Sequence, residues 1–302
     1  MPISPYIKEI GRGARGAKAL SREQAADLMG QVLDGTVTDL EVGAFCLAMR
    51  IKGETAQEMA GFLDALHQRV ARIPASGAPL IVLPSYNGAR KLPVLTPLLA
   101  LLLAREGLPV LLHGMRTEAR RILASDVLEA LGVPPMPAPQ AVAPGTVAHV
   151  HTSVLLPGLA RLLAVREVIG LRNPGHSAAK LLQPAQGEAV VVSSYTHPEY
   201  FAMLSEAFPL MGSTALLSRG LEGEVATDPR RAPRYDGFVR GVHQLLDEQQ
   251  PGTAQEVSGL PTEIDVAATA QYTRQVLNGH LPVPDALARQ VAHIVHLAHQ
   301  LA

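Results

Sequence analysis

Helical spacing of apolar residues fills the first part of this 302-residue chain. Ser21, Thr38 and Thr55 each precede such a run in the position of an N-cap. A basic segment at residues 4–22 comes first and is expected to be a short helix followed by a flexible loop. Residues 1–72 are therefore predicted to form a small all-helical domain. The segment 72–79, which holds two prolines and a glycine, is predicted to link this domain to the rest.

From residue 80 onward, short apolar runs alternate with helical patterns. Residues 81–83 form a buried strand signal, residues 95–106 an apolar helix that Gly107 ends, and residues 109–112 a second buried strand. Strand, helix, strand is a βαβ unit, whose crossover is almost always right-handed. Further strands are expected at 189–193 and 215–217, and further helices at 126–131, 155–165, 197–208, 265–278 and 285–302. Residues 73–302 are thus predicted to be a larger α/β domain with a mostly parallel central sheet.

Ligands of such sheets bind where the carboxyl ends of the strands meet their loops. In the predicted βαβ unit these loops hold Asn87, Gly88, Arg90, Lys91, His113, Arg116, Arg120 and Arg121. The expected site is therefore basic. Asn87-Gly88 is first of all a turn signal, and His113 is as well explained by a structural role at a strand end.

The composition and the net charge limit where an anion-binding surface could lie. Hydrophobic residues make up 47% and charged residues 18%, which is typical of a compact folded protein. The formal net charge is −1, so any affinity for anions must come from a local patch. Of the 26 basic residues 21 are Arg, whose planar guanidinium suits bidentate contacts with phosphate.

The single cysteine and the apolar segments give further expectations. Cys46 lies in an apolar run and is expected to be an inert buried thiol rather than a nucleophile. The N-terminus lacks the apolar segment of a secretory signal, and no apolar run approaches the length of a membrane span. We therefore expect a cytoplasmic protein.

Several segments resemble one known superfamily. The segment LSREQAADLMGQVLDGTVTDLEVGAFCLAMRIKGETAQEMAGFLDAL resembles the N-terminal domain of glycosyltransferase family 3, the anthranilate phosphoribosyltransferase and nucleoside phosphorylase superfamily. The similarity continues through GLPVLLHGMR, SDVLEALGV (125–133) and LLPGLARLLAVREVIGLR (155–172). The resemblance implies a small helical domain packed on a larger α/β domain, usually in a homodimer.

The catalytic motifs depart from those of the enzymes. The resemblance places the segment 84–88, PSYNG, where the enzymes have a glycine-rich pyrophosphate loop, and only glycines let a backbone approach a pyrophosphate so closely. The enzymes' magnesium-binding Asp-Glu pair falls near Glu224, where Glu224-Val225-Ala226 does not supply it. What remains is predicted to be a vestigial ligand pocket without metal, cofactor or catalytic residue, formed by Ser85, Asn87, Gly88, Thr96, His113 and Gly114.

The combination of YIKEIGRG, PSYNGARK, HGMRT and RGLEGE is most similar to the YbiB-type branch of the superfamily. That resemblance implies nucleic-acid binding without transferase activity. We therefore expect sequence-independent contacts between basic side chains and nucleic-acid phosphates. The residues expected to make them are Lys8, Arg12, Arg15, Arg90, Lys91, Arg116, Arg120, Arg121, Arg166, Arg172, Lys180, Arg230 and Arg231.

Two other functions remain open from the sequence. The alternative is a phosphoribosyltransferase that uses phosphoribosyl pyrophosphate, supported by the fold, by His113-Gly114 and by Arg166 and Arg172, which stay in register with the enzymes. A protein-partner module that reuses the fold is the third, and it would show an exposed apolar patch. His293, His296 and His299 recur at helical spacing, but without nearby Cys or carboxylates a solvated face explains them better than a metal site.

Overall fold

The computed structural model describes residues 3–13 and 15–301. The chain begins with a helical domain made of α1 (Ser4–Ile10), α2 (Arg22–Asp34), α3 (Asp39–Lys52) and α4 (Ala56–Arg69). The predicted caps are confirmed, because Ser21, Thr38 and Thr55 each accept a hydrogen bond from the backbone three residues on. Cys46 is buried in this domain, and burial raises the pKa of its thiol to about 12. It is therefore inert, as expected.

Seven strands form one sheet within the described residues, in the order β3-β2-β1-β4-β5-β6-β7. The strands are β1 (Leu80–Ser85), β2 (Val110–Gly114), β3 (Val147–His151), β4 (Ala189–Tyr195), β5 (Ala215–Arg219), β6 (Tyr235–Val239) and β7 (Val242–Asp247). The first five in this order are parallel, whereas β6 and β7 are antiparallel. The prediction of a helical domain joined to an α/β domain with a mostly parallel sheet is confirmed. The boundary at residue 72 stays a prediction.

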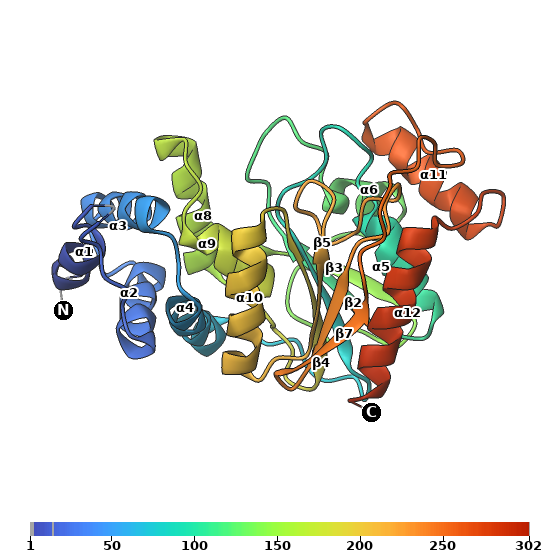
Figure 1. Cartoon of the computed structure of the whole chain (residues 1–302). Coiled ribbons are helices and arrows are strands. Elements are labelled where there is room, and N and C mark those ends of the chain that lie inside the picture. The colour runs from blue at the N-terminus through green and yellow to red at the C-terminus, as the bar shows by residue number, and fades with distance from the viewer. Residues whose placement is uncertain (1–2, 14, 302) are drawn as a thin grey trace.

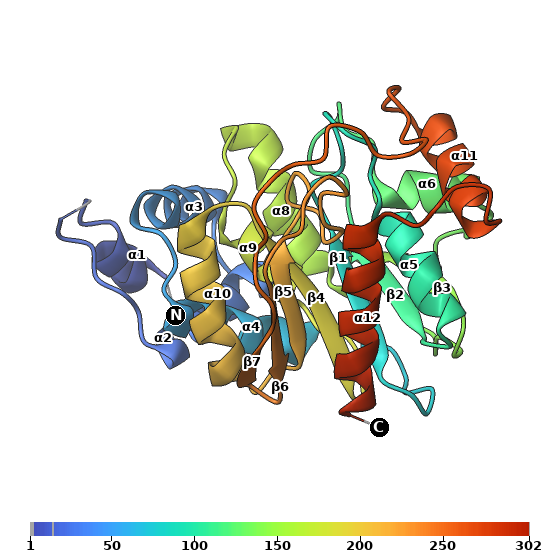
Figure 2. The ribbon, with the colours of Figure 1, turned by 45° about the vertical axis from the view of Figure 1, so that its right-hand side comes forward.

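Helices cover both faces of the sheet (Figures 1 and 2). They are α5 (Thr96–Arg105), α6 (Ala124–Ala130), α7 (Thr152–Leu155), α8 (Pro157–Ile169), α9 (Pro174–Ala178), α10 (Pro198–Met211), α11 (Val266–Leu277) and α12 (Asp285–His299), with a 3₁₀ turn at Ala179–Leu181. Successive residues of β1 point to opposite faces, as in any strand. Ile81 packs in one core with residues of α5 and α12, whereas Val82 packs in another with residues of α8 and α10.

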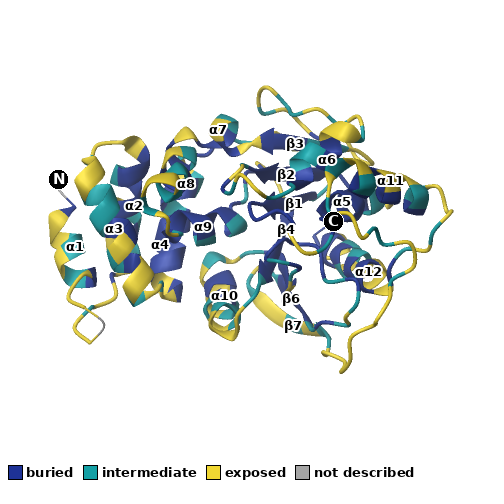
Figure 3. Ribbon diagram, turned by 90° about the horizontal axis from the view of Figure 1, so that it is seen from above, coloured by how far each residue is buried: buried dark blue, intermediate teal, exposed yellow. Residues whose placement is uncertain are grey.

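The second of these cores joins the two domains. It holds Leu28 of α2 and Phe62 of α4 together with Leu159 of α8 and Phe208 of α10. Seen from above, α8, α9 and α10 lie between the sheet and the N-terminal helices (Figure 3). The carboxyl ends of β1 and β4 therefore face the helical domain across these helices, and this arrangement positions the site.

Several elements differ from the sequence prediction. Strand β3 and the β6–β7 hairpin were not predicted, because polar residues interrupt their short apolar runs. Asp236 of β6 is fully buried and is balanced by Arg234 and His243, so a charged stretch that resembles a loop forms a strand. The helix expected over 155–165 is α8, which begins two residues later at Pro157 and continues to Ile169, and the short helix α7 before it was not predicted. Leu156 separates the two helices, because a residue before proline is disfavoured in the helical conformation.

Candidate functional site

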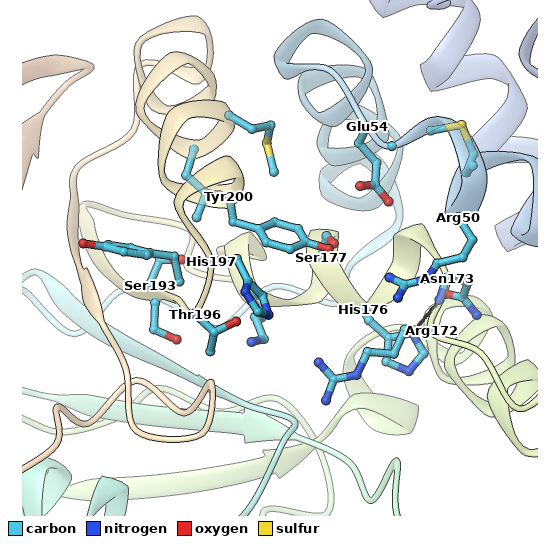
Figure 4. A pocket seen from close by; sticks show the side chains of 17 residues that line it. Arg50, Glu54, Arg172, Asn173, His176, Ser177, Ser193, Thr196, His197 and Tyr200 are labelled. Carbon is cyan, nitrogen blue, oxygen red and sulfur yellow. Dashed lines mark hydrogen bonds between the residues drawn. The ribbon is translucent and has the colours of Figure 1, made fainter. Parts of the chain in front are cut away.

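A cleft of about 430 Å³ lies between the helical domain and the α/β domain. Arg50 and Glu54 reach into it from the end of α3 and the turn that follows (Figure 4). Arg172 and His176 reach it from the α8–α9 region (Figure 4). The carboxyl end of β4 and the start of α10 close the remaining side with Ser193, Thr196, His197 and Tyr200. The cleft therefore lies at the carboxyl ends of the strands, where α/β sheets bind their ligands.

His176 is fixed by the short helix α9. The Asn173 side chain caps α9 by accepting from Gly175 N at 3.0 Å, and the backbone N–H of Asn173 donates to His176 Nδ1 at 3.2 Å. The Asn173 Oδ1 lies at 3.2 Å from the same Nδ1, and in either tautomer the buried Nε2 has no partner among the described residues. Burial lowers the pKa of His176 to about 3, so the ring is neutral. Because the backbone N–H of Asn173 donates to Nδ1, Nδ1 carries no proton and the proton of the neutral ring lies on Nε2. The Nε2–H group is then a donor without a partner among the described residues.

A second buried polar group of the cleft also lacks a partner. Ser193 Oγ, at the end of β4, makes no hydrogen bond to any described residue. Buried polar groups are normally hydrogen-bonded, and an unpaired one in a native structure calls for a ligand, an ion or a water. Two such groups on opposite walls of one cleft indicate a polar ligand.

The charge of the cleft is positive. Arg50, Arg172 and Lys180 line it, against Glu54 as its one carboxylate within the described residues. Burial lowers the pKa of Lys180 to about 8, and its Nζ donates to the Gly223 carbonyl at 2.8 Å. Burial, with the neighbouring Arg166 and Arg121, lowers the pKa of Arg172. Burial raises the pKa of Glu54.

The predicted ligand-pocket residues of the β1–α5 loop come together elsewhere, around Glu224. The backbone N–H groups of Asn87 and Gly88 both donate to Glu224 Oε1 at 2.8 Å. The hydroxyls of Ser85 and Thr96 donate to Oε2 at 2.6 and 3.2 Å. Glu224 is 2% exposed. The loop is therefore filled by a carboxylate of the chain itself.

Glu222 fills the next part of the same loop. Its Oε1 accepts from the backbone N–H groups of Arg90, Lys91 and Leu92 at 3.1, 2.6 and 3.3 Å. Its Oε2 lies 3.5 Å from Arg121. Magnesium needs carboxylate oxygens that are free to coordinate. Here the oxygens of Glu222 and Glu224 are occupied by N–H groups, hydroxyls and a guanidinium, so this arrangement does not fit a magnesium ion.

His113 and Gly114 have structural surroundings. His113 is fully buried between the Tyr86 hydroxyl, 2.9 Å from Nδ1, and the Leu182 carbonyl, 3.1 Å from Nε2. Burial lowers the pKa of His113 to about 4. A Cβ at Gly114 would lie 1.8 Å from the Ser85 carbonyl oxygen, so only glycine fits there. Neither residue lines the cleft.

The basic residues expected to bind phosphates lie in several parts of the fold, and Lys91, Arg230 and Arg231 line one pocket of the α/β domain. Six of them are ion-paired within the chain: Arg12 with Glu9, Arg116 with Asp126, Arg121 and Arg166 with Glu118, and Arg230 and Arg231 with Asp228. Lys8, Arg12 and Arg15 lie on or just after α1, at the end of the molecule away from the sheet (Figure 1). Arg90, Lys91 and Arg120 are exposed on loops of the α/β domain. Of the whole set, only Arg172 and Lys180 line the cleft.

Sequence reasoning missed most of the cleft. Arg50, Glu54, Ser193 and Tyr200 were not named as site residues. One signal was available for Ser193, because the polar segment Ser193–His197 directly follows the buried run of β4. No local pattern marks Arg50 or Glu54, which come from the other domain.

Comparison with known proteins gives a consistent set of relatives. Residues 4–70 match the helical bundle domain of a glycosyl transferase family. The chain is 40% identical over 302 residues to the Escherichia coli (strain K12) protein YbiB, covering 97% of this chain and 93% of that protein. It is 30% identical over 208 residues to the anthranilate phosphoribosyltransferase of Leifsonia xyli subsp. xyli, covering 68% of this chain and 59% of that enzyme. The crystal structure of anthranilate phosphoribosyltransferase from Thermus thermophilus has a TM-score of 0.75 at 23% identity, covering 98% of this chain and 88% of that one.

These findings correct the expected function. The prediction of a sequence-independent nucleic-acid-binding protein is wrong, because the enzymes among the relatives are anthranilate phosphoribosyltransferases and favour the phosphoribosyltransferase alternative. The structural neighbour shows that the fold is shared. The physical reason is that the abundance of Arg was interpreted as a phosphate-binding surface, whereas six of the ten named arginines form ion pairs with carboxylates of the folded chain. The homodimer stays a prediction. In the part of the chain that the structure describes, no helix has the length and apolar character needed to cross a bilayer.

Proposed function

This chain belongs to the family of Escherichia coli YbiB. We propose that it is a phosphoribosyltransferase-like enzyme, because it is also similar to several anthranilate phosphoribosyltransferases. Its substrates would meet in the cleft between the two domains. The donor would be an activated phosphoribosyl compound, and the acceptor a small aromatic amine that also carries a carboxylate, such as anthranilate. The sequence similarity to anthranilate phosphoribosyltransferases supports this choice.

The observation that carries the proposal is the set of unsatisfied polar groups in the cleft. His176 Nε2 and Ser193 Oγ are buried without partners among the described residues, beside the cations Arg172 and Lys180. Such groups lower the free energy of a bound anion, because water no longer competes for their hydrogen bonds. The cleft also offers the apolar side chains of Met49, Met203 and Leu204, against which an aromatic ring can pack.

The transfer would form one bond and break another at the sugar. The acceptor nitrogen donates its electron pair to the anomeric carbon, and the electrons of the C–O bond leave with pyrophosphate. The nitrogen then loses its proton, for which Glu54 is the carboxylate available in the cleft. Burial raises the pKa of Glu54, which strengthens it as a base relative to an exposed carboxylate. The residues around Glu224 do not fit a magnesium ion, so no step is assigned to one.

The test is direct detection of the product. The purified protein is incubated with phosphoribosyl pyrophosphate and anthranilate, with and without magnesium, and the N-phosphoribosyl product and pyrophosphate are measured. We expect product, and a loss on the order of 10²-fold for Arg172→Ala, because a lost cation no longer stabilises the developing negative charge.

Arg105→Ala is the matched control. Arg105 is an exposed arginine at the end of α5 and does not line the cleft. Its variant should keep full activity. Absence of product with anthranilate and with a panel of other aromatic amines, in a folded protein, would refute the proposal. Equal activity of Arg172→Ala and the parent would refute the site.

A further inference from the structure

The β1–α5 loop has the geometry of an anion-binding site. The consecutive N–H groups of Asn87 and Gly88 converge on a single oxygen at 2.8 Å each. Successive backbone N–H groups that point into one concavity form a nest, a structure that binds phosphates and other anions. The hydroxyls of Ser85 and Thr96 complete it by donating to the second oxygen. Two N–H groups and two hydroxyls are suited to an oxyanion.

The occupant of this nest is an anion from the same chain. We propose that Glu224 is an internal competitor for phosphate-bearing ligands, and that pyrophosphate enters the nest only after displacing its carboxylate. Glu224 lies in the segment between β5 and β6, 136 residues after Gly88, so tertiary structure alone brings it there. This inference concerns binding and does not depend on whether the chain transfers a sugar phosphate.

The segment that presents Glu224 is built to reach the loop. Glu222 has a left-handed φ of 52°, a conformation rare for a residue with a side chain. Gly223 has a φ of 83°, and a Cβ there would lie 1.9 Å from Asn87 Nδ2. The Gly223 carbonyl accepts from Lys180 at 2.8 Å, and the ammonium group of Lys180 interacts electrostatically with Glu224. The turn is therefore held against the loop at several points.

Glu222 occupies further backbone donors of the same β1–α5 loop. It takes up the N–H groups of Arg90, Lys91 and Leu92, so the two glutamates together satisfy five backbone donors of one loop. A tethered carboxylate acts at a high effective concentration and reduces the apparent affinity of any free anion by the fraction of time that the nest is open. A nest that is open for less than about a tenth of the time weakens binding more than about tenfold.

The experiment measures binding of inorganic pyrophosphate to the full chain by isothermal titration calorimetry, in the absence of any acceptor. The parent protein should bind pyrophosphate weakly through the cleft cations. Glu224→Ala empties the nest and should bind at least about tenfold more tightly. Glu256→Ala, which removes an exposed glutamate outside the loop, should match the parent. Equal affinities for Glu224→Ala and the parent, with both folded by circular dichroism, would overturn the proposal.

If Glu224→Ala does not fold without ligand, two further measurements keep the proposal testable: rescue of its folding by added anions, and pyrophosphate binding by Glu224→Gln. Folding that is restored by added pyrophosphate or phosphate supports the nest directly, because the free anion then replaces the carboxylate. If no anion restores folding, Glu224→Gln decides, since it keeps the size of the side chain and removes its charge. We expect Glu224→Gln to bind pyrophosphate severalfold more tightly than the parent, and no gain would refute the proposal. A failed transferase assay with a gain in pyrophosphate binding would refute only the proposed enzyme function.

Discussion

The cleft and the β1–α5 loop lie at the same edge of the sheet but treat their polar groups in opposite ways. In the cleft, His176 Nε2 and Ser193 Oγ are buried and unpaired among the described residues. In the loop, the donors of Asn87, Gly88 and Ser85 are all satisfied by Glu224. A buried donor without a partner is available to a ligand, an ion or a water, whereas a satisfied one stabilises the fold. Substrates are therefore expected in the cleft, whereas the donors of the β1–α5 loop are occupied by Glu224 of the same chain.

The largest effect should come from the turn that closes the loop. Gly223→Ala forces a Cβ against Asn87 at a left-handed φ, and we expect it to lower the free energy of unfolding by about 3 kcal/mol. Gly132→Ala is the control, because Gly132 also has a positive φ but has no atom within 4 Å of an added Cβ. It should cost about 1 kcal/mol. Urea unfolding measures both, and equal losses would mean that the contact with Asn87 is unimportant.

Acid should destabilise both regions through their buried histidines. His113 and His176 have pKa values lowered to about 4 and about 3, whereas in the unfolded chain each titrates near its ordinary value of about 6.5. The stability that each neutral histidine contributes is therefore fully present above its unfolded pKa of about 6.5. It is lost progressively as the pH falls from that value toward the lower pKa of the folded protein. At pH 5 each histidine should cost about 2 kcal/mol relative to pH 7.

The share of each histidine is measured by unfolding at the two pH values. His176→Gln should remove its part of the pH dependence, whereas His280→Gln, at an exposed position, should leave the dependence unchanged. A pH dependence that stays the same in His176→Gln would show that His176 is not held neutral in the folded protein.

Two serines at strand ends compare the regions directly. Ser85→Ala removes a 2.6 Å hydrogen bond to the Glu224 carboxylate and should lower the free energy of unfolding by about 1.5 kcal/mol. Ser193→Ala removes a hydroxyl without a partner among the described residues and should change stability by less than about 0.5 kcal/mol. Differential scanning calorimetry distinguishes them. A destabilised Ser193→Ala would mean that this hydroxyl is already used by the fold.

The smallest effect should be on anion binding by the cleft at alkaline pH. The pKa of Lys180 is about 8, so its ammonium group loses its charge as pH rises through that value. Sulfate keeps its charge over this range, and its affinity should fall about fivefold between pH 7 and 9. Calorimetric titration measures this change. Lys180→Met should bind weakly at both pH values, and a pH dependence that survives in this variant would assign the effect to another group.

Local patterns were sufficient for much of the fold. The capped helices of the first domain and the strands β1, β2, β4 and β5 were predicted, because caps, apolar runs and turns are properties of neighbouring residues. Strands β3, β6 and β7 were not, since His149, Asp236 and His243 interrupt their apolar residues and weaken the local strand signal. For Asp236, the pairing with His243 exists only once the hairpin has formed.

The sequence by itself determined that the chain has a helical domain followed by an α/β domain and that basic residues follow its first strands. Tertiary structure decided what those basic residues do, because pairs such as Arg166 and Glu118 or Arg121 and Glu222 join segments far apart in the chain. It also placed Glu224 in the loop after β1 and brought Glu54 of one domain to the cleft beside His176 of the other. Whether a polar group is satisfied depends on which distant group meets it in the folded chain, and this decides which of the two regions is open to a ligand.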